Sequence, residues 1–519
     1  MRPADTVRLQ VNYLPSSLNP LLSQDFLVKL VAFRTIFEPL VVVSANGDYQ
    51  PFLAASLEPL DHGRRFHITL RSNVRFHDGR PLTSGDVKYT MDEVLKRARK
   101  NRGSLSLLYA ELEQVVDLHV VNDLELDLVL RRRNYLFPSV LAEVPILPAH
   151  LYHCRGLGNP QLNRAPVGTG PFKLAPSPAV SQAEHPGQPA AVGSAAGPED
   201  RRQLTLVRNP DYWGQRPRLA SLVFDAVSDP ARALARLRNG ELDLIPQLHP
   251  SYYPDQVKGE RMTRRFRLLR IHPYRMRVML YNLRSGMVKD RRIRLALAHL
   301  TDRGRLVREM RNTLGQVIST PVWPLSSWFD SSVPHPYPYD RAVAARLLDA
   351  AGWLKQPGKL RQKQGHPLRM RLLVAREAPR MAQVAAMLKT ELLLAGIRLE
   401  VKTGDFGFVK SQLQRGNFDL ALVGLAPRPE SDLSPLLHSK GRLNLGHYDF
   451  PAVDRLLDAI RAIGPQGNRL RLLRQLYRVI HGEPPFLILY APIELILVDR
   501  EVSGLANNGR WPLLPALAR

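Results

Sequence analysis

The sequence contains few features that would cross-link the chain or insert it into a membrane. Its 519 residues include one cysteine, Cys154, so an internal disulfide cannot form. No run of about 18 or more apolar residues occurs, which excludes a membrane-spanning helix. Residues 1–11 lack the apolar segment of a secretory signal. We therefore expect either a cytoplasmic protein or one whose signal was removed before this numbering begins.

Acidic residues are scarce relative to basic ones. The chain has 73 Lys and Arg residues against 47 Asp and Glu residues, and its formal net charge is +26. The basic residues are spread along the chain, and the runs at 131–133 and 291–294 are short, which is typical of a solvated surface. Neither zinc-finger spacing nor an arginine-rich tail is present, so we expect no nucleic-acid partner. An anionic ligand, an anionic membrane surface and plain compositional bias all remain open.

Signatures of catalysis are also missing. No nucleophile–base pair, no paired carboxylates at a recognisable spacing and no His-Glu metal motif emerge. Gly168 and Gly170 form a Gly-x-Gly, but no Gly-Lys-Ser/Thr follows it and no helix opens from it, so it does not predict a phosphate-binding loop. We expect no enzyme, no metal site and no cofactor.

A strand, a turn and a helix are predicted close together near residue 80. Alternating apolar residues at 66–70 predict the strand, and Asp78-Gly79 predicts the turn. The helix begins after Thr83 or Ser84, and its capping box is expected to be incomplete because the fourth residue from Ser84 is Val87.

Several acidic and histidine side chains in this part of the chain have two interpretations. His77, Asp78 and Asp86 form either a metal or acid–base site, or a structural turn in which the helix dipole stabilises Asp86. We favour the structural interpretation, since three mixed ligands across a turn are a weak signal. Asp302 is likewise expected to cap a break in a helix over 290–310.

The remaining pattern is that of an α/β protein long enough for two or three domains, with 44% hydrophobic residues. Strands and helices alternate, which favours a mixed α/β sheet with helices on both faces. Residues 176–203, rich in Pro, Ala, Gly and Ser, are expected to be a flexible surface insertion. The main predicted strands are 7–13, 115–121, 124–130, 204–207, 276–283, 369–374, 397–402, 418–425 and 486–490, and the main predicted helices are 26–37, 231–238, 340–351, 378–394, 406–415, 451–463 and 468–481.

An ordered set of short motifs resembles the extracytoplasmic solute-binding proteins of ABC importers, in the peptide, dipeptide and nickel-binding family (family 5). The resemblance spans nearly the whole chain. It is carried by Asn19-Pro20, Phe37-Glu38-Pro39-Leu40, the stretch 70–95, Pro166 to Phe172, Arg208 to Trp213, Gly240 to Asp243, Tyr281-Asn282, Asp290 to Leu297, Asp302-Arg303, Leu347 to Gly352, Gly396-Ile397 and Asn417 to Asp419.

The resemblance implies a two-lobed, periplasmic-binding-protein-like fold of type II with an extra subdomain in the first lobe. Lobe one would comprise residues 1–270 and 485–519, with the subdomain at about 45–165, and lobe two residues 271–484. It also implies a monomer, periplasmic or otherwise extracytoplasmic, that captures a peptide or peptide-like solute in an interlobe cleft and delivers it to a membrane permease of an ABC importer. Hinge closure would be the mechanism.

The resemblance carries over to the ligand site only in part. Peptide-binding members hold a tryptophan and then an acid after the strand that follows Phe418-Asp419, whereas this chain has Leu425 and then Arg428 at those positions. If Arg428 faces the cleft, it favours a carboxylate or phosphate; the alternative is a solvent-exposed arginine. If the loop is shifted, Glu430 or Asp432 restores the acid. The predicted ligand-binding residues are Asn19, Asn282, Trp323, Leu425, Ala426, Arg428, Glu430, Ser431 and Asp432. Trp323 and Trp328 are either pocket walls or core.

A second function class is a ligand-sensing domain of a cytoplasmic transcription regulator. The absent signal and the basic charge suit it. Such regulators place a DNA-binding domain before the sensor, and no room for one precedes residue 7 in this sequence, so we favour transport.

Overall fold

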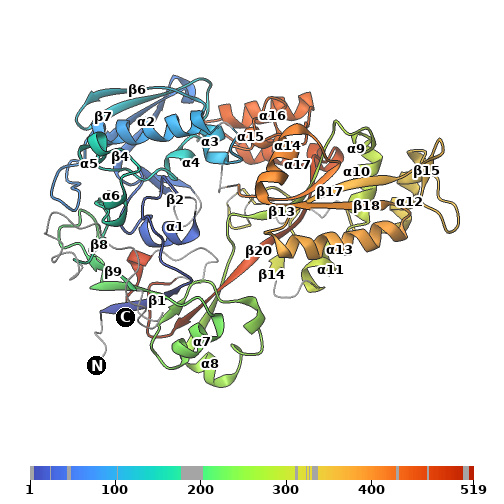
Figure 1. The fold of residues 1–519 in the computed structure, drawn as a ribbon. Helices are drawn as coiled ribbons and strands as arrows, with labels where there is room; N and C mark the ends of the chain where they lie inside the picture. The colour runs from blue at the N-terminus through green and yellow to red at the C-terminus, as the bar shows by residue number, and fades with distance from the viewer. Residues whose placement is uncertain are drawn as a thin grey trace, which may run out of the picture.

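The computed structural model describes residues 5–23, 25–43, 48–101, 103–176, 203–309, 314–322, 324–326, 328–329, 337–427, 432–464, 467–505 and 514–518. The predicted insertion at 176–203 lies almost entirely outside the described residues. Two bodies are joined by strands that pass between them, which we call lobe one and lobe two (Figure 1).

One twelve-stranded sheet runs through both lobes in the order β18-β17-β19-β13-β20-β11-β1-β10-β9-β8, with β12 and β14 pairing to β20. Lobe one holds the part from β11 to β8 together with β12, and lobe two holds the part from β18 to β13. The strands are β1 (Thr6–Val11), β8 (Phe172–Leu174), β9 (Gln203–Arg208), β10 (Ser221–Ala226), β11 (Leu244–Ile245), β12 (Phe266–Ile271), β13 (Met276–Tyr281), β14 (Leu314–Gln316), β17 (Arg369–Ala375), β18 (Arg398–Gly404), β19 (Leu420–Leu425) and β20 (Phe486–Asp499).

Lobe one carries a separate four-stranded antiparallel sheet in the order β4-β5-β7-β6. Helix α2 packs along this sheet, and its buried residues include Val87, Met91 and Val94. The elements of this region are β4 (Ala54–Leu60), β5 (Arg65–Leu70), β6 (Val115–Asn122), β7 (Glu125–Leu130), α2 (Ser84–Lys100), α3 (Leu107–Leu112), α4 (Pro138–Leu141), α5 (Ala149–Arg155) and α6 (Pro160–Arg164). The rest of lobe one adds α1 (Phe26–Ala32), β2 (Val41–Val43), β3 (Tyr49–Pro51), α7 (Pro230–Arg238) and α8 (Glu260–Arg265).

Lobe two is built around the predicted βαβ unit. Strands β17 and β18 pair in parallel and are linked by α13, so the expected order of elements at 369–402 is confirmed. The helices of this lobe are α9 (Gly286–Lys289), α10 (Arg291–His299), α11 (Arg303–Glu309), α12 (Arg341–Ala350), α13 (Pro379–Leu394), α14 (Phe406–Arg415), α15 (Ser434–Leu437), α16 (Pro451–Ala462) and α17 (Arg469–Gly482), beside a small hairpin of β15 (Gln362–Lys363) and β16 (His366–Pro367).

Local capping differs from the prediction in one place. The capping box of α2 is complete, because Thr83 rather than Ser84 is the N-cap and Asp86 supplies the acid. The Asp86 carboxylate accepts from the Thr83 backbone N–H at 2.9 Å and from its hydroxyl at 3.0 Å. The prediction of an incomplete box was therefore wrong, because the N-cap lies one residue before Ser84.

Two further helix boundaries follow from local chemistry. Asp302 caps α11, since its Oδ1 accepts from the Arg305 backbone N–H at 2.8 Å, and the predicted break in the helix is confirmed. Helix α1 ends at Ala32, five residues earlier than expected, and Arg34 then adopts a positive φ of 66°. Within the part of the chain that the structure describes, no helix has the length and apolarity needed to cross a membrane.

Candidate functional site

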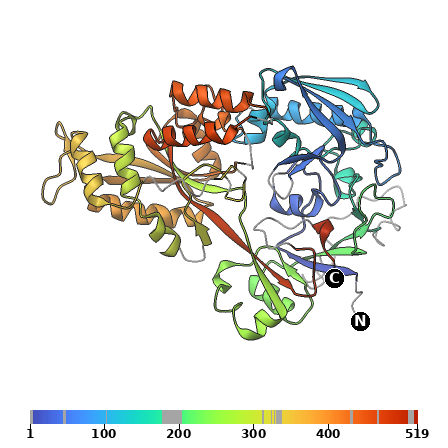
Figure 2. The ribbon, with the colours of Figure 1, turned by 180° about the vertical axis from the view of Figure 1, so that it is seen from behind.

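The chain passes between the lobes in two places, and both lie in or beside paired strands. The first is the short connection from β12 to β13. The second is β20, whose residues 486–490 pair with β13 while residues 494–499 pair with β12. In Figure 2 this strand runs continuously from one lobe to the other. Two crossings side by side form a geometry that permits the lobes to rotate about them.

The lobes also touch away from the crossings, along a contact that we call the seam. It lies where the subdomain of lobe one meets α15 and α16. Arg461 is its centre: one of its Nη atoms donates to Gln114 Oε1 at 2.7 Å, and its Nε lies 3.3 Å from Asp432 Oδ2. Its backbone carbonyl accepts from the N–H of Tyr135 at 2.9 Å. Beside it, Leu136 of lobe one packs in the core of lobe two with residues of α16 and α17.

Asp432, expected to bind ligand, lies in this seam. It is 1% exposed, and its other oxygen accepts from the Ser434 backbone N–H at 2.8 Å. Leu425 is half-buried and Ala426 is exposed at the end of β19. Four other predicted ligand residues, Trp323, Arg428, Glu430 and Ser431, lie outside the described residues.

The two asparagines predicted to bind ligand, Asn19 and Asn282, lie in different lobes. Asn19 is fully buried in lobe one, where its amide donates to Asn163 Oδ1 at 3.0 Å. Asn282 follows β13, and its amide donates to the carbonyls of Gly416 and Phe418 at 2.9 and 2.8 Å. Both side-chain amides therefore form hydrogen bonds within their own lobe. Trp328 packs against the core that contains Leu136 and residues of α16 and α17, with the Arg469 guanidinium 5.4 Å from its ring.

Arg277 is a residue that the sequence analysis missed. It lies in β13 opposite Gly424 of β19, where a Cβ would approach Arg277 Nη1 to 2.6 Å. Burial lowers the pKa of its guanidinium, nearby Arg275 and Arg380 lower it further, and Tyr490 opposes them. Within the described residues it forms no ion pair with a carboxylate. An arginine inside the otherwise apolar run Met-Arg-Val-Met-Leu-Tyr was the available signal.

Three of the motif stretches meet at one buried carboxylate, Glu38. Its oxygens accept from Thr169 Oγ1 at 2.9 Å, Tyr212 OH at 2.7 Å and Trp213 Nε1 at 2.9 Å. Burial raises the pKa of Glu38 to about 7, although these three hydrogen bonds and the Arg34 charge favour the ionised form. These hydrogen bonds join the motif stretches 37–40, 166–172 and 208–213 to one another.

His77 connects the predicted turn to the same Gly-x-Gly. Its Nδ1 accepts from the Gly168 N–H at 3.3 Å, and its Nε2 donates to the Gly170 carbonyl at 2.9 Å. This neutral form is retained because burial lowers the pKa of His77 to about 4. Asp78 pairs instead with His150 at 2.7 Å. These contacts agree with the structural interpretation.

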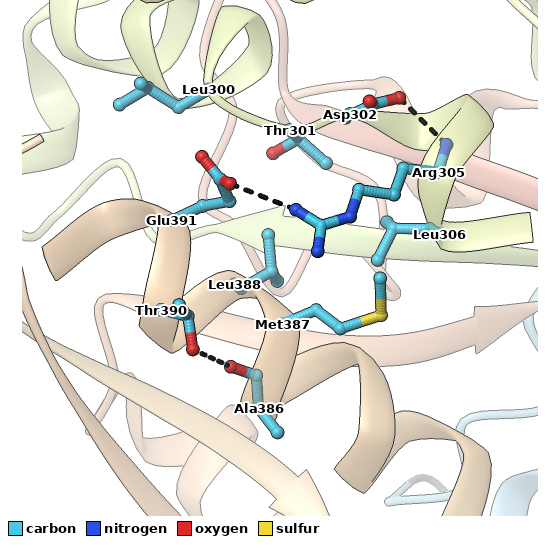
Figure 3. Close-up of a pocket in the computed structure, with 10 residues that line it drawn as sticks. All are labelled: Leu300, Thr301, Asp302, Arg305, Leu306, Ala386, Met387, Leu388, Thr390 and Glu391. Carbon is cyan, nitrogen blue, oxygen red and sulfur yellow. Dashed lines mark hydrogen bonds and ion pairs between the residues drawn. The ribbon is translucent and has the colours of Figure 1, made fainter. Parts of the chain in front are cut away.

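One cavity lies wholly inside lobe two, between α11 and α13 (Figure 3). Arg305 Nη1 lies 3.3 Å from Glu391 Oε1 across it, and Glu391 also accepts from Arg341 and Tyr339. No residue of lobe one lines it, so it is not a site between the lobes.

The comparisons with known proteins decide the family. Residues 48–444 match the bacterial extracellular solute-binding proteins, family 5 middle. The chain belongs to this family. Its membership confirms the resemblance, and the sensor domain of a transcription regulator is not favoured.

Relatives of this family 5 chain match over most of their length. Protein XP55 of Streptomyces lividans is 28% identical over 515 residues, covering 97% of this chain and 87% of that protein. The oligopeptide-binding protein AppA of Bacillus subtilis is 24% identical, covering 87% and 80%. The crystal structure of NikA from Brucella suis in complex with Fe(III)-EDTA is 21% identical, covers 99% of each chain and has a TM-score of 0.78. The fold is therefore the two-lobed, type II α/β fold that the resemblance implied.

Proposed function

We propose that this chain is the solute-binding component of an ABC importer, which captures a peptide or peptide-like solute between its lobes and delivers it to a membrane permease. The observation that carries the proposal is the pair of crossings, β12 to β13 and β20, which lie side by side and permit one lobe to rotate against the other. A ligand that contacts both lobes would stabilise the closed arrangement. We further propose a monomer, periplasmic or otherwise extracytoplasmic, with the lobe boundaries at 1–270 plus 485–519 and 271–484.

The cleft is proposed to accept a solute with a carboxylate or another oxyanion. Arg277 supports this, because a guanidinium shielded from water without a carboxylate partner is costly and gains most from an anionic ligand. Gly424 leaves the room that this guanidinium occupies. Leu425, Ala426, Arg428, Glu430, Ser431 and Asp432, with Asn19, Asn282 and Trp323, remain the predicted ligand residues.

Thermal-shift screening followed by calorimetry tests the function. Probes are di- to pentapeptides, organic polycarboxylates, and metal chelates such as Fe(III)-EDTA, which the NikA neighbour holds. A ligand that binds only the folded state raises the apparent stability. If no class raises the unfolding temperature, the solute-binding proposal fails.

The Arg277→Gln variant tests the ligand's charge. We expect affinity for the best anionic probe to fall by about tenfold or more, because a hydrogen bond to a charged group is worth about 1.5–3 kcal/mol. Arg346→Gln, which removes an exposed charge on α12, is the matched control. Equal affinity of Arg277→Gln and wild type would reject the role of Arg277 while leaving solute binding intact.

A further inference from the structure

A basic pocket of about 500 Å³ lies on the seam. Lobe one contributes the end of α2, the α3–β6 connection and the residues after β7. Lobe two contributes α15, residues 440–442 and α16. The cationic residues that line it are Arg99, Arg131, Arg132, Lys440, Arg442 and Arg461.

Two of these cations are already matched by carboxylates. Arg461 lies 3.3 Å from Asp432 Oδ2 and 3.7 Å from Asp458 Oδ1. Arg442 Nη1 lies 3.4 Å from Glu113 Oε1 across the seam.

A further carboxylate beside lining residue His438, Asp454, has partners as well. It accepts from the backbone N–H of Ser439 at 2.8 Å, and it lies 3.5 Å from His438 Nδ1. Glu113, Asp432, Asp454 and Asp458 therefore each have a partner of their own.

Four cations remain unmatched. Within the described residues, the side chains of Arg99, Arg131, Arg132 and Lys440 form no ion pair and no hydrogen bond. The first three belong to lobe one and Lys440 to lobe two. Salt screens like charges only partly when they lie closer together than the Debye length of about 8–10 Å, so repulsion among cations that line one pocket opposes closure of the lobes.

We propose that this pocket binds a multivalent oxyanion of the phosphate class, which bridges the lobes at the seam. The arginine forks of residues 131 and 132 suit the bidentate geometry of phosphate oxygens, and Lys440 supplies a point charge from the opposite wall. The bound anion converts repulsion across the seam into attraction. This proposal does not depend on the identity of the solute.

Calorimetric titration of the full chain with inorganic pyrophosphate, at neutral pH and low chloride, tests the site. We expect saturable binding of one anion per chain. The Arg131→Gln/Arg132→Gln variant should lose about tenfold or more in affinity, and Lys440→Gln, altered on the other lobe, should lose several-fold. All three side chains are exposed, so these variants should fold as the wild type does.

The matched control removes the same charge elsewhere. Arg346→Gln/Arg398→Gln takes two exposed arginines from α12 and β18 and should bind pyrophosphate as the wild type does. An equal loss in the control would mean that pyrophosphate responds only to the chain's overall charge, and would overturn the proposal. Absence of saturable binding would overturn it too. Loss in only one of the two test variants would place the anion on one lobe and reject the bridge.

Discussion

Burial shifts the pKa values of two titratable groups of lobe one, Glu38 and His77, in opposite directions. Glu38 has its pKa raised from an ordinary 4.5 to about 7, and His77 has its pKa lowered from 6.5 to about 4. Folding therefore binds a proton at Glu38 and releases one at His77 over nearly the same pH range. The two effects on stability have opposite signs and nearly cancel.

Glu38→Gln should expose the slope due to His77. Between pH 4 and 6.5 the unfolded chain binds more protons at His77 than the folded chain, so stability rises with pH, by about 3 kcal/mol over the window. Urea unfolding of the variant from pH 4 to 8 should show this rise relative to wild type. Parallel profiles for the two proteins would contradict the raised pKa of Glu38.

His77→Gln should expose the opposite slope. Between pH 4.5 and 7 the folded chain retains the Glu38 proton that the unfolded chain has lost, so stability should fall by about 3 kcal/mol as pH rises. The same unfolding series measures it. The double variant is the control, and its profile should be as flat as that of wild type in this range.

At the scale of elements, the Gly168-Thr169-Gly170 connection passes against the loop after α1. A Cβ on Gly168 would overlap the carbonyl oxygen of Ile36, and the Gly170 N–H donates to that same oxygen at 2.9 Å. The motif is thus required by close backbone approach rather than by a phosphate.

Gly168→Ala should destabilise the protein by about 1–3 kcal/mol, the usual cost of overpacking a site where backbone must move. Urea unfolding at pH 7 measures it. Gly286→Ala is the control, because nothing lies within 4 Å of a Cβ there and its φ is not positive. A similar small effect in both variants would contradict the packing argument.

Regular elements with strong periodicity were predictable, whereas those defined by distant partners were not. The βαβ unit at 369–402 and the hairpin of β6 and β7 follow from local pattern. Strand β20 was predicted to cover only residues 486–490. It extends to Asp499 although it contains Pro492, which lacks an N–H and normally ends a central strand. The proline is tolerated because it lies where the strand leaves one lobe for the other.

The candidate site was less predictable than the fold. The Glu38 cluster joins three stretches far apart in sequence, and no local pattern indicates that they meet. Arg277 is marked in the sequence by the apolar run around it, but its position beside Gly424 is seen only in the structure. Family resemblance supplied the lobes, which periodicity alone does not reveal.

At the scale of the whole molecule, Gln114 links the lobes through Arg461. Gln114→Ala should shift the ligand-free protein toward an open arrangement, because the hydrogen bond at 2.7 Å to Arg461 is lost. Small-angle X-ray scattering should show a larger radius of gyration. Gln203→Ala removes an amide that bonds within lobe one, to Asp225, and should leave the radius unchanged. An unchanged radius in Gln114→Ala would show that Gln114 does not hold the seam.

The place of β20 in the sequence has a consequence for biosynthesis. This strand begins at Phe486, and it pairs with β13 in lobe two as well as with β11 and β12 in lobe one. A ribosome therefore releases almost the entire polypeptide before either lobe can gain its central strand. Until then both β13 and β11 present unpaired edges. The nascent chain must be kept from aggregating for nearly its whole time of synthesis, and neither lobe can be produced intact as a fragment cut before residue 486.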